Sequence, residues 1–180
     1  DRDKEMEHNQ LLTVFNSLPV GIGFFTADGT LVRCNESFCR IFGADSQTLL
    51  GNKLNINENS VVPDVVKEAV RRCVPVQMSF LYDFDKQRTD KRFFSTRTRT
   101  CYLKCNGNPL YDNDGKFVNY IFIFEDITET VKSEEVLRQS RRKTELAMKA
   151  ANIMFWEFDA VAKLFYSDNE PLNGYDQSKP

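Results

Sequence analysis

Few side chains in this sequence are of the types that carry out chemistry. Its 180 residues include one histidine and five cysteines. The histidine, His8, lies in a charged N-terminal stretch. One histidine cannot build a metal site with several histidine ligands, and it argues against a Ser-His-Asp hydrolase.

The cysteines predict no disulfide framework. Their number is odd and their spacings match no disulfide scaffold, which favours a reducing compartment. Cys101 and Cys105 would share one face of a strand, because side chains repeat every two residues. They could form half of a metal site, but the sequence offers neither a second pair nor a histidine. We therefore interpret all five as small buried hydrophobic residues: Cys34, Cys39, Cys73, Cys101 and Cys105.

Enzyme activity is not expected in this chain. There is no glycine-rich phosphate loop, no nucleophile beside a base and no carboxylate pair at an informative spacing.

A net charge of −2 argues against nucleic acid or an anionic membrane as the main partner. No apolar run reaches about 18 residues, so we expect no membrane contact in this segment. Residues 1–10 are charged and show no signal peptide. We expect a cytoplasmic location, with any membrane anchor of a parent protein elsewhere.

The composition predicts a folded domain with a large core. Apolar residues make up 41% and charged residues 28% of the chain, which is typical of a globular protein. The 15 phenylalanines are enough to fill a core and to line a pocket. The length fits one domain, or one domain and a piece of another.

In the first half, the pattern predicts a helix, a hairpin and three short helices. Pro19 ends the first helix, because the residue before a proline avoids the helical conformation. Asp28-Gly29 is a hairpin turn signal. Asn35 can cap the next helix, a structural role, and Gly43 can end it. The expected helices are 1–18, 36–42, 46–50 and 63–73, and the expected strands are 20–26 and 31–34.

The second half predicts three strands and a long helix. The expected strands are 76–84, 92–103 (extending to about 106) and 117–124, with a charged turn at 85–90. Turn residues fall between 106 and 115, around Pro109. Arg97 and Arg99 alternate with threonines, which places the arginines on the wet face of a strand.

The last strand passes directly into the helix expected at 128–151. Thr128 is a good N-cap, and Asp126 can bond backbone amides or a nearby arginine. Thr130, Leu137, Thr144 and Ala151 recur every seven residues along the helix. Two interpretations stay open: a solvated connecting helix, or a weak parallel two-helix seam that needs a partner chain.

A short internal repeat follows this helix. Ile22, Phe24, Phe25 and Asp28 recur, shifted by 131 positions, as Ile153, Phe155, Trp156 and Asp159. We interpret this as a truncated second copy of the first hairpin, with strands at 153–158 and 164–167 around a turn at Asp159. An isolated hairpin is marginal in water, so we expect it to pair with another chain or stay peripheral.

The element order predicts an α+β fold. It has a five-stranded antiparallel sheet with short helices on one face, flanked by an N-terminal helix and a C-terminal linker helix. With these elements, the chain resembles a PAS domain of bacterial sensor histidine kinases. The residues that carry the resemblance are Leu18 to Gly23, Asp28-Gly29, Asn35 with Ser37-Phe38, Gly43, Pro109 to Asp112, Asp114-Gly115 and Asp126 to Glu129.

The resemblance implies a domain organisation and a function. The domains would be an N-terminal amphipathic helix at 1–18, a PAS domain at 19–128, a signalling helix at 129–151 and the start of a second PAS domain at 152–180. The chain would be the sensory or signal-relay module of a two-component kinase. Asp126, Ile127 and Thr128 would be its signal-transfer junction. The alternative is a dimerisation or interaction module with a filled core and no ligand.

The resemblance also bears on ligands and partners. Haem is disfavoured because helix 63–73 has no histidine, and covalent flavin because Asn35 to Phe42 only partly follows the light-sensing pattern. We predict no cofactor, and a small organic ligand stays open. Expected partners are a second copy, through the N-terminal and linker helices, and a downstream kinase domain. The candidate pocket residues are Phe24, Phe38, Phe42, Val66, Met78, Phe80, Phe122 and Phe124.

Overall fold

The computed structural model describes residues 2–87, 95–151, 156–159, 161, 164–167 and 170–171. The chain divides into two compact units, Asp1–Val131 and Lys132–Pro180, which we describe separately. The start of the strand expected at 92–103, the end of the turn expected at 85–90 and the first residues of the strand expected at 153–158 lie outside the described residues.

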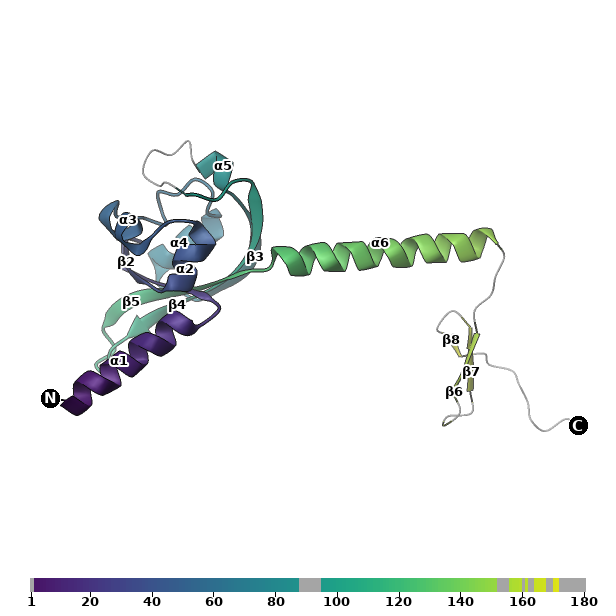
Figure 1. Cartoon of the computed structure of the whole chain (residues 1–180), viewed down its shortest axis with the longest axis horizontal. Coiled ribbons are helices and arrows are strands. Elements are labelled where there is room, and N and C mark those ends of the chain that lie inside the picture. Colours follow the sequence, from purple (N-terminus) through teal and green to yellow (C-terminus); the bar gives the residue numbers. More distant parts are fainter. Residues whose placement is uncertain are drawn as a thin grey trace, which may run out of the picture. The chain divides into compact units, whose positions relative to one another are not determined.

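A five-stranded antiparallel sheet forms the centre of the first unit. Its strand order is β2-β1-β5-β4-β3. Figure 1 shows the sheet with the helices packed around it. The register places Gly21 opposite Phe124 between β1 and β5, and Cys105 opposite both Met78 and Phe124 on the two sides of β4. This is the predicted α+β architecture. The strands are β1 (Gly21–Phe25), β2 (Leu31–Cys34), β3 (Val76–Asp83), β4 (Thr100–Tyr111) and β5 (Phe117–Asp126).

Short helices cover one face of this sheet, and the N-terminal helix lies on the other side (Figure 1). A Cβ at Gly21 would lie 2.9 Å from the Phe38 Cα, so glycine allows α2 to approach β1 closely. The helices are α1 (Arg2–Ser17), α2 (Glu36–Phe42), α3 (Ser46–Gly51), α4 (Asp64–Arg72), α5 (Phe84–Gln87) and α6 (Thr128–Ala150).

Aromatic rings dominate the core between the sheet and the helices. The Phe38 ring centroid lies 4.5 Å from that of Phe42 and 5.8 Å from that of Phe124. Phe25 meets Phe122 edge-on at 5.5 Å. Such pairs contribute about 0.5–1.5 kcal/mol each beyond their buried area. The core is therefore filled mainly by rings from β1, α2 and β5.

The fourth strand differs from the sequence prediction at both ends. Ser95 to Arg99 form no strand, because their hydrogen bonds go to the end of α2 and to Asp85, and Arg99 has a positive φ of 69°. At the other end, Pro109 lies inside β4 and not in a turn. The neighbouring β3 begins at Val76, opposite Gly107, so the missing amide of Pro109 falls beyond that neighbour.

Two further expectations need correction. Phe84 begins the short helix α5 and does not end β3, because the Asp83 carboxylate accepts a hydrogen bond from the Lys86 amide and starts a turn. In the second unit, Asp159 lies in a strand opposite Leu164 and not in a turn. The strands there are β6 (Trp156–Asp159), β7 (Leu164–Ser167) and β8 (Glu170–Pro171), in the order β6-β7-β8.

Among the helices that the structure describes, none combines the length and the apolar character needed to cross a membrane.

Candidate functional site

The last strand passes into α6 through a set of polar contacts that we name the junction cluster: Arg97, Tyr102, Asp126 and Thr128. The Asp126 Oδ1 accepts hydrogen bonds from the Thr128 amide, at 3.1 Å, and from the Thr128 hydroxyl. The Thr128 Oγ1 accepts a bond from the Tyr102 amide at 2.9 Å. The Tyr102 carbonyl accepts from the Ile127 amide at 2.9 Å. The first residue of α6 is therefore tied to β4.

This geometry corrects the expected role of Thr128. Thr128 is the first helical residue, and its hydroxyl points to Asp126 and Tyr102 and not to a free amide of the helix. Asp126 supplies the acceptor for the free amide at the helix start. The predicted bond between Asp126 and backbone amides is thus confirmed.

Arg97 connects the junction cluster to the flap helix α2. Its Nη2 donates to the Asp126 Oδ2 at 2.9 Å, and its Nη1 donates to the Ile41 carbonyl at 2.9 Å. The guanidinium carbon lies 5.0 Å from the Phe84 ring centroid. The alternation with threonine predicted that Arg97 points to the wet face of a strand. That prediction is wrong, because its guanidinium group bonds to Ile41 and Asp126. The arginine partner expected for Asp126 is this residue.

Hydrogen bonds stabilise the ionised form of the Asp126 carboxyl group. Burial alone would raise its pKa, but the hydrogen bonds from Thr128 and Arg97 together outweigh burial and hold the pKa below 3.8. The side chains of Arg97 and Asp126 are 33% and 27% exposed. The ion pair is therefore partly accessible to water and lies outside the core, so breaking it costs little free energy.

The C-terminal end of α2 fits closely against the segment that carries Arg97. The Ser95 hydroxyl donates to the Phe42 carbonyl at 2.7 Å, and the Thr96 amide donates to the Gly43 carbonyl at 2.7 Å. Gly43 has a positive φ of 65°, and a Cβ there would lie 2.8 Å from the Arg97 Cγ. Only glycine permits this approach.

The opposite end of α2 is held by Asn35, as the sequence predicted. The Asn35 Oδ1 accepts from the Ile22 amide at 2.8 Å and the Phe38 amide at 2.9 Å. Its Nδ2 donates to the carbonyls of Phe15, at 2.9 Å, and Val20, at 3.0 Å. All four hydrogen-bonding positions of the amide are used, in a side chain with no exposed surface. Asn35 thereby joins α1, β1 and α2.

A cavity of about 30 Å³ lies between the sheet and the flap helices, and we name it the core cavity. That volume is about the space of one water molecule. The Asn59 Nδ2 donates to the Tyr82 hydroxyl at 2.9 Å, which gives the apolar wall one polar position. The lining residues are Phe25, Phe38, Phe42, Leu54, Ile56, Asn59, Val62, Phe80, Tyr82 and Phe124.

The structure brings only some of the predicted pocket residues together. Phe38, Phe42, Phe80 and Phe124 line the core cavity. Val66 and Phe122 are fully buried in the core without lining it, and Met78 packs against the core at its edge.

Phe24 lies on the wrong side of the sheet for a pocket residue. Its ring centroid is 6.1 Å from that of Phe15 in α1. In the consecutive pair Phe24-Phe25 only one ring can face the flap, and it is Phe25. Asn59 and Tyr82 supply the polar position in the wall of the core cavity, although the sequence did not indicate them as pocket residues.

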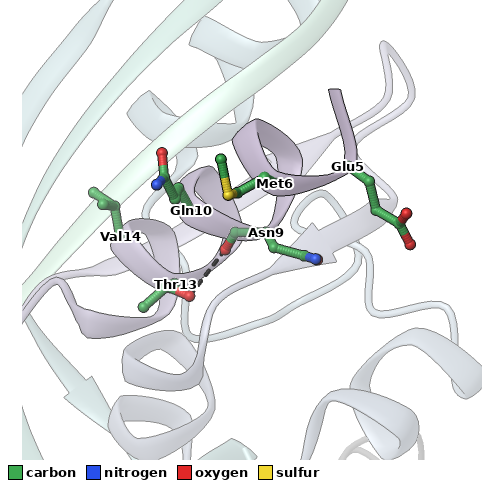
Figure 2. A pocket seen from close by; sticks show the side chains of 6 residues that line it. All are labelled: Glu5, Met6, Asn9, Gln10, Thr13 and Val14. Carbon is green, nitrogen blue, oxygen red and sulfur yellow. Dashed lines mark hydrogen bonds between the residues drawn. The ribbon is translucent and has the colours of Figure 1, made fainter. Parts of the chain in front are cut away.

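The N-terminal helix presents a shallow hollow to solvent. Figure 2 shows that all six lining side chains come from α1, with the Thr13 hydroxyl bonded to the Asn9 carbonyl at 2.9 Å. Two of the six, Met6 and Val14, are apolar and 60% and 57% exposed. The hollow is an exposed helix face with no convergent polar groups, so it does not resemble a ligand site.

Metal binding finds no support in the described part of the chain, where no three side chains of His, Cys, Asp or Glu gather in one place.

Comparisons with known proteins agree with this fold. A family model described as the PAS fold matches residues 15–132. The PAS domain of a Colwellia psychrerythraea protein has a TM-score of 0.51 and 15% identity, over 67% of this chain and 97% of that one. A PAS domain from a two-component sensor histidine kinase has a TM-score of 0.50 and 14% identity, over 68% of this chain and 98% of that one.

One curated relative extends the match beyond the domain. The probable diguanylate cyclase DgcE of Escherichia coli (strain K12) is 20% identical over 157 residues, which cover 87% of this chain. The chain spans only 14% of the length of that relative. Together, the sheet order, the flap helices and the family match over residues 15–132 establish that the chain belongs to the PAS-fold family.

Proposed function

We propose that this chain is a signal-relay module, in which a change in the flap helix α2 reaches the output helix α6 through Arg97. The observation that carries the proposal is the bridge made by one guanidinium group. It donates both to the Ile41 carbonyl at the end of α2 and to the Asp126 carboxylate at the start of α6. Because about a third of each side chain of the bridge is exposed to water, a modest force suffices to change it.

The two ends of α2 make it suitable as the moving part. Its N-terminal end is joined to α1 through Asn35, and its C-terminal end contacts the segment that carries Arg97. A displacement of α1, or of the core rings Phe38 and Phe42, would therefore reach Asp126 through a short series of contacts.

The relay as proposed needs no resident cofactor. A cavity of about 30 Å³ cannot hold haem or flavin. A small organic molecule could enter only if half-buried side chains at the wall, such as Phe80 and Leu54, moved aside. Entry of this kind would displace the rings of α2, so ligand binding and helix movement would be one event.

The catalytic output belongs, in this proposal, to a domain outside the chain. We propose a two-component sensor histidine kinase of bacterial type, operating in the cytoplasm, with no enzyme activity in the present segment. The similarity to a probable diguanylate cyclase makes cyclase output the second candidate. Both enzymes would use α6 as the connection to the catalytic part.

A double-mutant cycle tests the relay. Gly43→Ala forces a Cβ against Arg97 and strains a positive-φ position, which perturbs the C-terminal end of α2. We expect it to speed hydrogen exchange of the Thr128 amide by about 5-fold, the effect of weakening one hydrogen bond by about 1 kcal/mol. In an Arg97→Met background the same substitution should have almost no effect on that amide.

Arg99→Met provides the matched control, because Arg99 lies on the same segment and its described hydrogen bonds go through its backbone to Asp85 and Phe84, away from α2 and α6. In that background Gly43→Ala should act on Thr128 as in the wild type. If Gly43→Ala acts equally in all three backgrounds, the coupling does not run through Arg97 and the proposed relay is rejected.

A second candidate function is a dimerisation module with a filled core. The exposed apolar side chains of α1, which include Met6, Leu11 and Val14, favour it. We propose a homodimer through α1 and α6. Sedimentation equilibrium of the full chain should show a dimer that Met6→Glu with Val14→Glu dissociates. A wild-type monomer at high concentration would remove this candidate and leave the relay proposal standing.

A further inference from the structure

Two cysteine thiols meet at the corner where β2 turns into α2. Cys34 is the last residue of β2, and Cys39 lies in α2. Their sulfur atoms are 3.8 Å apart, in hydrogen-bonding contact. We name this pair the corner thiols. The other cysteines do not share this arrangement: Cys73 bonds to the Val70 carbonyl, and Cys101 and Cys105 are buried in the core.

The corner thiols are reachable from solvent. Both side chains are only partly buried, whereas Cys101 and Cys105 have at most 1% of their surface exposed. A disulfide bond requires the two sulfurs to approach to about 2 Å. From a contact of 3.8 Å, rotation of each side chain about its Cα–Cβ bond is the expected route to that distance. Contact between the sulfurs and access from solvent are two of the conditions for an intramolecular disulfide.

We propose that Cys34 and Cys39 form a reversible disulfide by exchange with a small-molecule disulfide. The evidence for this modification site does not rest on the proposed relay. Cys39 attacks one sulfur of the small disulfide and releases the first small thiol. Cys34 then attacks the Cys39 sulfur of the mixed disulfide and releases the second. Two electrons pass from the corner thiols to the small disulfide, and their two protons end on the two small thiols or in solvent.

The order of attack follows from the environment of each sulfur. Burial raises the pKa of Cys34 to about 12, with Cys39 adding to the rise. Burial also raises the pKa of Cys39, but a hydrogen bond from Cys34 offsets part of it. The Cys39 thiolate is therefore the easier one to form. Exchange is slow at neutral pH and faster in alkaline solution, because the thiolate is the nucleophile.

The position of the disulfide gives it a structural consequence. Asn35 lies between the corner thiols in the chain and holds α1, β1 and α2 together. A bond from Cys34 to Cys39 would close a loop around Asn35 and staple the end of β2 to α2. The small loop adds little stability through chain entropy, so its effect would be local.

The experiment uses the full chain, reduced and then equilibrated with mixtures of glutathione and glutathione disulfide at pH about 8. Free thiols are trapped by alkylation, and the protein is analysed by intact mass and peptide mapping. The expected result is the loss of two free thiols and of the mass of two hydrogen atoms. Both changes should map to Cys34 and Cys39 and should be reversed by dithiothreitol.

Single substitutions separate pairing from simple exposure. Cys73→Ser should leave the Cys34–Cys39 bond unchanged. Cys34→Ser should leave Cys39 carrying a glutathione that nothing displaces, and circular dichroism would verify the fold of each variant. The proposal is overturned if, at equilibrium in the most oxidising mixture, the wild-type Cys34 and Cys39 stay reduced or each keeps a bound glutathione.

Discussion

Asn35 and Asp126 occupy matching places in the chain, yet they are built for different tasks. Each follows or ends a strand, and each accepts a hydrogen bond from an amide in the first turn of a helix. Asn35 is a neutral amide with no exposed surface and four partners. Asp126 is a charged carboxylate with 27% of its side chain exposed, bonded to Thr128 and Arg97.

The two sites differ in the free energy that is lost when their hydrogen bonds are broken. Breaking the Asn35 contacts would leave buried donors and acceptors without partners, which is costly at any pH. Breaking the Asp126 contacts exposes groups that water can solvate, which costs little. The fold therefore depends more strongly on the Asn35 site, whereas the proposed relay needs a site such as Asp126 that could change its contacts while the domain stays folded.

The largest expected effect comes from Asn35→Ala. Loss of four buried hydrogen bonds should lower the free energy of unfolding by about 3 kcal/mol. Urea titration followed by far-ultraviolet circular dichroism measures it. Asn16→Ala is the matched control, because Asn16 accepts a single bond, at 3.3 Å from the Glu36 amide, and should lose less than about 1 kcal/mol. If Asn35→Ala and Asn16→Ala lose the same free energy of unfolding, the four hydrogen bonds of Asn35 do not contribute more to stability than the single bond of Asn16.

A smaller effect is expected at Thr128. Thr128→Ala removes the acceptor for the Tyr102 amide and should cost about 1 kcal/mol in the free energy of unfolding. Thr128→Ser keeps the hydroxyl and should recover most of the loss. The same urea titration applies. If serine is as harmful as alanine, the contribution of Thr128 lies in its methyl group and not in the junction cluster.

The smallest effect is the dependence of stability on pH at Asp126. The folded pKa lies below the ordinary 3.8, so the stabilisation is fully present above about pH 5, begins to fall near the unfolded pKa and is lost as the pH falls through the folded pKa. The difference in unfolding free energy between the wild type and Asp126→Asn should therefore shrink as the pH falls from about 5. A difference that stays constant down to the acid limit would contradict the ion-pair contribution.

The sequence predicted the fold through signals that are local. Asn35 and Gly43 bracket α2, and Asp28-Gly29 turns the first hairpin, because capping and turn formation depend on a few adjacent residues. Asp126 could be expected to bond amides for the same reason. These features need no knowledge of the rest of the molecule.

The missed features depend on contacts between distant segments. Arg97 alternates with threonines, so periodicity placed it on a wet strand face. In the structure it bonds instead to Ile41 in α2 and to Asp126, and neither contact can be inferred from neighbouring residues in the sequence. Phe24 and Phe25 are equally apolar, so the pattern could not decide which of the two faces the flap. Asn59 reaches Tyr82 across a separation of 23 residues, which no short motif reports.

The length of α6 gives the junction cluster a mechanical consequence. All 23 residues of α6 form a continuous helix, none of them buried within the described structure. At 1.5 Å of rise per residue, the helix is about 35 Å long, so a tilt of about 5° at Thr128 would move its far end by about 3 Å. In the proposed relay, the helix would therefore act as a lever arm that converts a change the size of one broken hydrogen bond into a displacement that a partner domain can detect.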